Sequence, residues 1–509
     1  MKRPVIKSSP KSKLALHRAA LAVGLIASAA AAFGIPARTT YGAQLSVDEP
    51  QYLMTAISLG EDFDLDISDE ISEKRYLPFH EIDLNAQTID LNDNGQRLSP
   101  HDPLLPALLA LPMRLGGWVG ARVALSILAG VLAATTLWVA VRRFGVSTLT
   151  GAWVVGALSA TPPLTAYGSQ IYPEIPAALA VTAAVGAATG LATTTANRTL
   201  QIRETVILLL SLTALPWLSV KYTPTAAALA GITGLRLWRD GRRHQLVIVG
   251  LALTVMATVY LIVHNRIYGG WTVYAAGDHF TNSEFGVVGF QPDYLGRSRR
   301  LVGLLIDRPF GLAAWSPAWL AIAPALGAIF GRRPQNWMLL TAPLAAGWAT
   351  ATWVALTMHG WWWPGRQLVV VLPLAVILIA IAVDQARRTL VPLVVTAMVG
   401  AVGWVWLAVE ASTGRRALAV DITETKWVGY RWFSQLLPDL HRGSTTDLWW
   451  AAGWAIFLLG VIGWSACRSK TNYRPAAPKS VQIDKDASGG KGSYADNVSA
   501  DFDGRGPIR

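Results

Sequence analysis

The residues of this sequence that could do chemistry stand beside long apolar runs. Asp48 and Glu49 follow the first apolar run, Glu174 lies between two later runs, and Lys221 and Arg366 are basic residues in similar positions. A carboxylate can take a proton from a hydroxyl group. A guanidinium and an ammonium group can hold a phosphate. Together these residue types predict chemistry on a phosphate-bearing substrate, provided that the fold brings them to one place.

The elements that must position these residues are membrane-spanning helices. Of the 509 residues, 52% are hydrophobic and only 15% are charged, and the mean hydropathy is +0.36. This composition excludes an ordinary soluble enzyme. The Lys and Arg residues behind the net charge of +12 occur in short clusters between apolar runs, as topology requires, rather than along one patch. We therefore predict an all-α integral membrane protein that binds membrane lipids and no nucleic acid.

Apolar runs long enough to cross a hydrocarbon core of about 30 Å recur along most of the chain. We predict about 12 spans, at roughly 14–34, 119–141, 149–167, 175–194, 205–220, 222–238, 245–264, 310–330, 337–357, 367–384, 390–410 and 448–466. If the basic N-terminus is cytoplasmic, most of the later basic pairs are cytoplasmic as well.

This topology divides the chain into three parts. We predict a cytoplasmic N-terminus over 1–13, a transmembrane domain over 14–466, and a disordered cytoplasmic tail over 467–509. Longer segments at about 35–118, 265–309 and 411–447 then lie outside. The first run is basic and rich in alanine, which is also typical of a cleavable signal, but we favour a retained anchor. The single cysteine, Cys467, excludes an intramolecular disulfide.

The first outer segment contains features that are not spans. The apolar stretch from Leu104 to Trp118 is interrupted by prolines and an arginine and ends in a Gly-Gly pair. We interpret it as an interfacial helix. Asp93-Asn94-Gly95 predicts a hairpin turn between two short strands.

Successive connections between spans alternate between the two sides of the membrane, and this alternation places the residues that could do chemistry on the outer face. These residues are Asp48, Glu49, Tyr172, Glu174, Lys221, His359 and Arg366. Each alone has an ordinary explanation, such as a solvated acid, a snorkelling lysine or an aromatic belt. Their joint occurrence favours a site for a lipid phosphate. The spans carry few ionisable residues, whereas transporters carry theirs near the bilayer midplane.

The order of several motifs resembles that of the polyprenyl-phosphate-dependent glycosyltransferases of the GT-C fold. It is similar to that of protein mannosyltransferases and aminoarabinose transferases, over about residues 19–384. The motifs are Val47–Leu53, Ser58–Leu65, Gly95–Leu104, Gly168–Glu174, Ser219–Pro224, Asp307–Leu312 with Ser316-Pro317, and Gly360–Arg366. Asp102 departs from the pattern, since the family has a small residue or proline there.

This resemblance implies a GT-C membrane bundle in the bacterial inner membrane. It implies a hexosyl- or pentosyltransferase that moves a sugar, with inversion, from a polyprenyl phosphate to an extracytoplasmic glycan, lipid or protein. The implied catalytic residues are Asp48, as the base, and Glu49. The implied substrate-binding residues are Tyr52, His101, Tyr172, Glu174, Lys221, His359 and Arg366. A transporter or flippase of lipid-linked sugars and an inactive scaffold subunit of a cell-envelope glycan pathway remain alternatives.

No cofactor is indicated by the sequence, although the resemblance is compatible with a divalent metal. There is no His or Cys cluster of the kind that holds zinc. Asp62, Asp64, Asp66 and Glu73 match positions 1, 3, 5 and 12 of a calcium loop, but Ile67 stands where that loop needs glycine. We therefore interpret this run as a solvated acidic stretch with no metal.

Overall fold

The computed structural model describes residues 10–91, 95–193, 198–273, 293–355 and 357–471. Predictions that concern the first nine residues, the hairpin turn at 92–94, much of the second outer segment and the tail from 472 onward lie outside the described residues. Helices dominate the described chain. A short antiparallel pair, β1 (Ile89–Leu91) and β2 (Gln96–Leu98), flanks the predicted hairpin turn.

Within the described residues, seven helical segments are long and apolar enough to cross a membrane. They lie in α1 (Pro10–Ala32), α4 (Leu104–Phe144), α7 (Glu174–Thr193), α8 (Arg198–Leu218), α10 (Arg243–Tyr268), α17 (Leu390–Ser412) and α19 (Thr445–Thr471). Shorter helices complete the bundle: α5 (Thr148–Ser159), α9 (Thr223–Arg239), α14 (Ile322–Arg332), α15 (Met338–Ala349) and α16 (Leu372–Gln385). The predicted all-α, multi-pass membrane architecture is confirmed, whereas the count of twelve spans stays a prediction.

Two predicted spans are not continuous helices. The run at 149–167 stops as α5 before Pro162-Pro163 and resumes as α6 (Leu164–Tyr167). The run at 310–330 is divided at Ser316-Pro317 into α13 (Leu312–Trp315), a 3₁₀ turn and α14. Proline lacks the N–H that a helix needs and clashes with the preceding turn, so both breaks follow from the sequence.

The two breaks meet inside the bundle. Trp319 Nε1 donates to the carbonyl of Pro162 at 2.8 Å, and the Tyr167 hydroxyl donates to the carbonyl of Trp363 at 2.6 Å. Trp363 belongs to the loop that leads to Arg366. The interrupted helices therefore help to fix the position of that arginine.

The stretch from Leu104 to Trp118 forms the first part of α4, but the helix is broken where the sequence has its Gly-Gly pair. Gly116 and Gly117 both leave helical geometry, and Gly117 has a φ of +58°. A positive φ is easily adopted only by glycine. The break separates a short proximal helix from the longer apolar part of α4, and the interfacial position of the proximal helix stays a prediction.

Close helix contacts in the bundle depend on small residues. A Cβ on Gly130 of α4 would lie 2.1 Å from Ser28 Oγ and 2.6 Å from the Gly24 carbonyl of α1. A Cβ on Gly327 of α14 would lie 2.3 Å from the Ile462 carbonyl of α19. Small residues at helix crossings are typical of packing within membranes.

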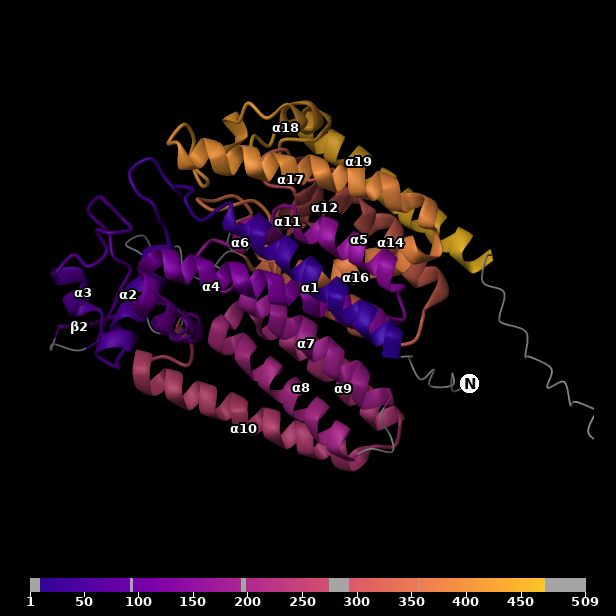
Figure 1. Cartoon of the computed structure of the whole chain (residues 1–509), viewed down its shortest axis with the longest axis horizontal. Helices are drawn as coiled ribbons and strands as arrows, with labels where there is room; N and C mark the ends of the chain where they lie inside the picture. The colour runs from indigo at the N-terminus through magenta and orange to yellow at the C-terminus, as the bar shows by residue number, and fades with distance from the viewer. Residues whose placement is uncertain (1–9, 92–94, 194–197, 274–292, 356, 472–509) are drawn as a thin grey trace, which may run out of the picture.

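The two ends of the bundle differ in character. Figure 1 shows α2 (Glu49–Glu61), α3 (Ser68–Ser72) and β2 at the left end, while α1 begins and α19 ends toward the right. Four arginines that lie just beyond the ends of predicted spans line one cavity of about 650 Å³ between α14, α16, α17 and α19: Arg332, Arg387, Arg388 and Arg468.

Candidate active site

Four charged residues that the sequence singles out stand where helices begin. Asp48 is the N-cap of α2, and Glu174 is the first residue of α7. Lys221 lies in a 3₁₀ turn (Val220–Tyr222) that leads directly into α9. Arg366 opens another 3₁₀ turn (Arg366–Leu368) ahead of α16, after Gly365 with a φ of +82°. Rigid helices thus carry each side chain to a defined point.

These four side chains form one connected group, which we name the charge cluster. Arg366 Nη2 lies 2.9 Å from Asp48 Oδ2, and Arg366 Nε donates to Glu174 Oε1 at 3.0 Å. Lys221 Nζ donates to the same Glu174 oxygen at 2.9 Å. Two carboxylates therefore face two cations, so the charge cluster is balanced in the absence of substrate.

Exposure differs within the charge cluster and shows where a substrate can approach. The side chains of Glu174 and Arg366 are only 1% and 8% exposed, whereas those of Asp48 and Lys221 are 19% and 23% exposed. Glu174 is the buried anchor that holds both cations. Asp48 and Lys221 form the side that a ligand can reach.

Aromatic side chains surround the charge cluster. The Arg366 guanidinium lies 4.0 Å from the ring centroid of Tyr172 and 5.4 Å from that of Trp362. Tyr52 packs against His101 with ring centroids 4.4 Å apart, and it meets Tyr172 edge-on at 6.4 Å. Of the predicted substrate-binding residues, Tyr52, His101 and Tyr172 are thus brought to the charge cluster.

The electrostatics of the charge cluster favour an ionised Asp48 beside a neutral His101. Burial by itself acts to raise the pKa of the Asp48 carboxyl, but the charges of Arg366 and Lys221, together with the hydrogen bond from Arg366, outweigh it and hold that pKa below its ordinary value. Burial lowers the pKa of His101 to about 4, although nearby Asp48 opposes this effect. His101 Nε2 lies 4.0 Å from Asp48 Oδ1, and Ser99 Oγ lies 2.9 Å from His101 Nδ1.

A buried hydrogen-bond network around Asp102, which the sequence did not reveal, supports the turn that carries Lys221 of the charge cluster. Asp102 Oδ2 accepts from the Val220 N–H at 3.1 Å, which fixes the turn that carries Lys221. Asp102 Oδ1 lies 3.0 Å from both the Tyr260 hydroxyl and His264 Nε2 of α10. The departure of Asp102 from the family pattern was the only signal in the sequence.

Glu49, predicted as catalytic, points away from the charge cluster. Its side chain is fully buried, and it accepts from Thr39 Oγ1 at 2.7 Å and from the Ile171 N–H at 2.9 Å. Arg122 Nη2 of α4 lies 3.7 Å from it. Arg122 is a second residue that the sequence did not single out. Glu49 therefore links the segments that carry Thr39, Ile171 and Arg122, and it does not lie at the surface that a substrate can reach.

His359, predicted to bind substrate, belongs to a different set of contacts. Its Nε2 lies 3.0 Å from Asp307 Oδ2, and its ring lies 4.8 Å from that of His441. Asp307 also accepts from the Leu440 N–H at 2.8 Å. The described contacts of His359 thus join the turn before α13 to the segment that precedes α19.

Comparison with known proteins gave structural likenesses only. No family model matches the chain, and no curated protein matches it. The chain is similar to ArnT from Cupriavidus metallidurans bound to undecaprenyl phosphate, with a TM-score of 0.46 and 14% identity over 90% of this chain and 78% of that one. For the same protein in the apo state the values are 0.47 and 13% over 89% and 77%.

A third likeness is to the oligosaccharyltransferase of Archaeoglobus fulgidus in its apo form. Its TM-score is 0.46 and its identity 13%, over 79% of this chain and 56% of that chain. These proteins are glycosyltransferases of the GT-C fold, the class that the sequence motifs resemble. At identities of 13 to 14%, the function of the present chain must be inferred from the geometry of the charge cluster itself.

Proposed function

We propose that this protein is a membrane glycosyltransferase that moves a sugar from a polyprenyl-phosphate donor to a hydroxyl group of an extracytoplasmic glycan, lipid or protein. One observation supports this most: a partly exposed carboxylate, Asp48, is held within 3 Å of a guanidinium that also shares Glu174 with Lys221. A general base and two phosphate-binding cations are thus within reach of one substrate.

The reaction follows from these groups. Asp48 accepts the proton of the acceptor hydroxyl, whose oxygen forms a new bond to the anomeric carbon. The bond from that carbon to the phosphate oxygen breaks, and the phosphate leaves with the electron pair. Attack from the side opposite the phosphate inverts the configuration. Arg366 and Lys221 stabilise the charge that develops on the phosphate, so no general acid is required.

The ion pair between Arg366 and Asp48 links donor binding to the activity of the base. A donor phosphate at Arg366 and Lys221 competes with Asp48 for positive charge. The pKa of Asp48, which these cations depress, then rises, and the carboxylate becomes a stronger base. Asp48 is therefore most basic when the donor is in place.

An apolar cavity supports a lipid-linked substrate. It has a volume of about 570 Å³ and lies between α12 (Arg300–Ile306), α14, α15 and α19. Its lining is almost wholly hydrocarbon and includes Trp348 and Trp353. The segment that follows Trp353 leads to Arg366, so one loop connects this cavity with the charge cluster. An isoprenoid chain would fit such a surface.

We place the protein in the bacterial inner membrane with both termini in the cytoplasm and the charge cluster outside. The support for this orientation is the group of arginines around the cavity between α14, α16, α17 and α19. Positive residues are retained on the cytoplasmic side. Sugar transfer would then occur on the face where lipid-linked donors are presented.

The test is consumption of polyprenyl-phosphate hexoses and pentoses by the purified protein in nanodiscs, with a membrane extract as the source of acceptor. Asp48→Asn should lower the rate about 10²–10⁴-fold, because it removes the general base. Asp83→Asn is the matched control, since that carboxylate is 90% exposed and pairs only with Lys74 among its described contacts.

Equal rates for the wild type and Asp48→Asn would remove Asp48 from the mechanism. No consumption by either protein, with donor and acceptor shown to be present, would favour the transporter or the scaffold instead. Dependence on membrane potential would then select the transporter.

A further inference from the structure

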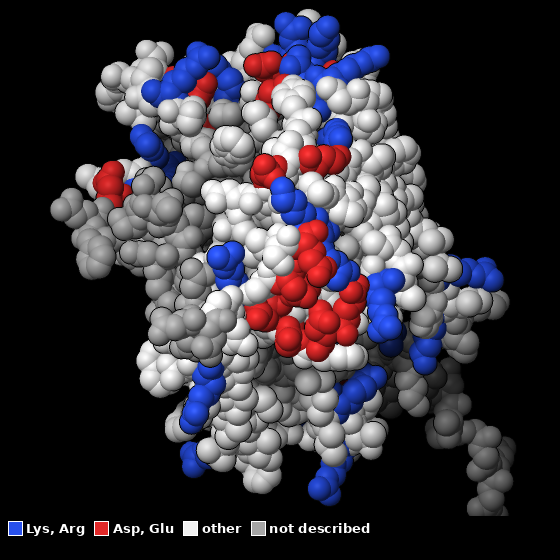
Figure 2. Space-filling model, turned by 90° about the vertical axis from the view of Figure 1, so that its left-hand side faces the viewer, with Lys and Arg blue, Asp and Glu red and all other residues white. Residues whose placement is uncertain are grey.

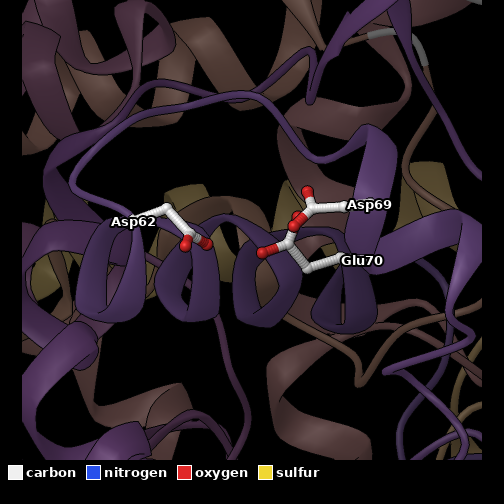
Figure 3. A group of neighbouring side chains, drawn as sticks. All are labelled: Asp62, Asp69 and Glu70. Carbon is white, nitrogen blue, oxygen red and sulfur yellow. The ribbon is translucent and has the colours of Figure 1, made fainter.

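Three carboxylates meet at the end of α2 that is opposite Asp48. Asp62 is the C-cap of α2, while Asp69 and Glu70 belong to α3. One oxygen from each lies within 4.8 Å of the others. Figure 3 shows Glu70 between the other two, with the three carboxyl groups turned toward one another. Figure 2 shows acidic side chains gathered on this end of the molecule.

Glu70 is the unusual member of this group, which we name the acidic triad. It is fully buried, and neither of its carboxylate oxygens has a hydrogen-bond donor within the described part of the chain. A buried carboxyl group without a partner is destabilising. Such a group next to two more carboxylates indicates a missing positive ligand.

Two neighbouring basic side chains make their close ion pairs with carboxylates outside the acidic triad. Arg75 lies 2.8 Å from both oxygens of Glu61, and Lys74 lies 3.1 Å from Asp83. Both are thus engaged with other carboxylates.

The geometry of the acidic triad suits a hard divalent cation. The donors are all carboxylate oxygens, which Ca²⁺ prefers, and Ca²⁺ lies about 2.3–2.6 Å from each ligand oxygen. Ligand oxygens around one such ion are therefore at most about 5 Å apart. The separation limit of 4.8 Å in the acidic triad meets this condition. The C-terminal end of a helix also favours a cation, and Asp62 caps that end of α2.

We propose that Asp62, Asp69 and Glu70 form a Ca²⁺ site that joins the end of α2 to α3. This site differs from the partial calcium-loop match in the sequence, which we interpreted as free of metal, and it shares only Asp62 with that match. In the structure, Asp64 Oδ1 accepts from Ser58 Oγ at 2.8 Å and Asp66 Oδ1 accepts from Ser68 Oγ at 2.5 Å. The proposal is independent of the proposed function, since none of its ligands belongs to the charge cluster.

The test is calorimetric titration of CaCl₂ into full-length protein in nanodiscs of zwitterionic lipid, after removal of metals with a chelator. We expect one saturable site with a Kd of about 10⁻⁴–10⁻³ M, as in extracellular calcium modules. Ca²⁺ should also raise the temperature of unfolding. Glu70→Gln keeps the shape of the side chain and should weaken binding at least about tenfold, as should Asp62→Asn.

Glu73→Gln is the matched control, because Glu73 is exposed, lies three residues from Glu70 and would be a ligand only in the calcium loop. It should bind Ca²⁺ like the wild type. The proposal is overturned if the wild type shows no saturable binding, if Glu70→Gln binds with unchanged affinity, or if Glu73→Gln loses as much affinity as Glu70→Gln. Tighter binding of Mg²⁺ than of Ca²⁺ would overturn the assignment of the ion.

Discussion

The two ends of α2 carry carboxylates in opposite electrostatic situations. At the N-terminal end, Asp48 and Glu174 face Arg366 and Lys221, with contacts of 2.9–3.0 Å. At the C-terminal end, Asp62, Asp69 and Glu70 face one another. The charges of the first group are balanced without a ligand, whereas those of the second group would be balanced only by a bound cation.

This difference separates two ways of grouping charged side chains. In the charge cluster the cations that would bind a phosphate are held by carboxylates beforehand, so a substrate must replace an existing pair. In the acidic triad a ligand would instead relieve repulsion. Substitution of a carboxylate should therefore have opposite effects on stability at the two ends, and the following predictions use that contrast.

The largest expected effect on stability is that of Glu174→Gln. The amide leaves Arg366 and Lys221 buried without their shared anion, and breaking a buried ion pair in this way costs about 3–5 kcal/mol. Thermal or denaturant unfolding in detergent would measure the loss. Glu204 pairs with Arg143 at 2.7 Å and lies outside the charge cluster. The loss of stability in Glu204→Gln therefore provides a comparison with that in Glu174→Gln. Unchanged stability of Glu174→Gln would contradict the balanced charge cluster.

Arg366→Lys should lower turnover about 10²-fold, since a misplaced charged group loses the benefit of orientation. Lysine retains the positive charge but cannot contact Asp48 and Glu174 through separate nitrogens while stacking on Tyr172. Steady-state kinetics with the polyprenyl-phosphate donor would measure the change. Arg297→Lys, outside the charge cluster, should stay close to wild type. Full activity of Arg366→Lys would show that only net charge matters.

His101→Gln should change how stability depends on pH. The pKa of His101 is lowered to about 4, so the unfolded chain, with an ordinary value near 6.5, binds more protons between these values. The wild type therefore loses stability as pH falls from about 6.5 toward 4, by about 3 kcal/mol from this group. The variant should lack that contribution. Unfolding temperatures at several pH values would test this, and parallel curves for the two proteins would refute it.

Glu70→Gln should have the smallest effect and the opposite sign to Glu174→Gln. In the presence of chelator, removing the unpartnered buried carboxyl should stabilise the protein by about 1–2 kcal/mol. The same unfolding assay as for Glu174→Gln gives the direct comparison. Destabilisation by Glu70→Gln without any cation would mean that the carboxyl has a partner in the folded state.

Much of the fold followed from simple features of the sequence. Hydrophobic length predicted the long helices, and the Gly116-Gly117 pair marked the end of the first part of α4. The breaks at Pro162-Pro163 and Ser316-Pro317 were not predicted, although proline explains both of them. What the sequence could not show is that two of these breaks meet, because contacts such as that between Trp319 and Pro162 join residues far apart in the chain.

The candidate site was predictable only in part. Asp48, Glu174, Lys221 and Arg366 share a face because the parity of helices is readable from hydrophobicity, and the structure brings them into contact. Which of two adjacent acids faces the site depends on the direction in which α2 begins, so Glu49 could not be distinguished from Asp48. Its catalytic role and those of the other site residues stay predictions.

Long-range partners explain the remaining differences. His359 meets Asp307, and Asp102 meets His264, across 52 and 162 residues of sequence. The acidic triad depends on the turn between α2 and α3, which places Asp69 and Glu70, rather than Asp64 and Asp66, beside Asp62. Sequence spacing matched only the second set, and the lack of glycine at Ile67 led us to interpret that run as free of metal.

The length of α2 has a consequence for how its two ends could communicate. Its 13 residues extend for about 20 Å, or roughly two Debye lengths at physiological ionic strength. A cation at Asp62 would thus leave the protonation of Asp48 almost untouched through space. Any influence would be mechanical, because a cation that fixes the C-terminal end of α2 would change the tilt of the whole helix. Such a change would alter the rate of turnover without moving the pH optimum.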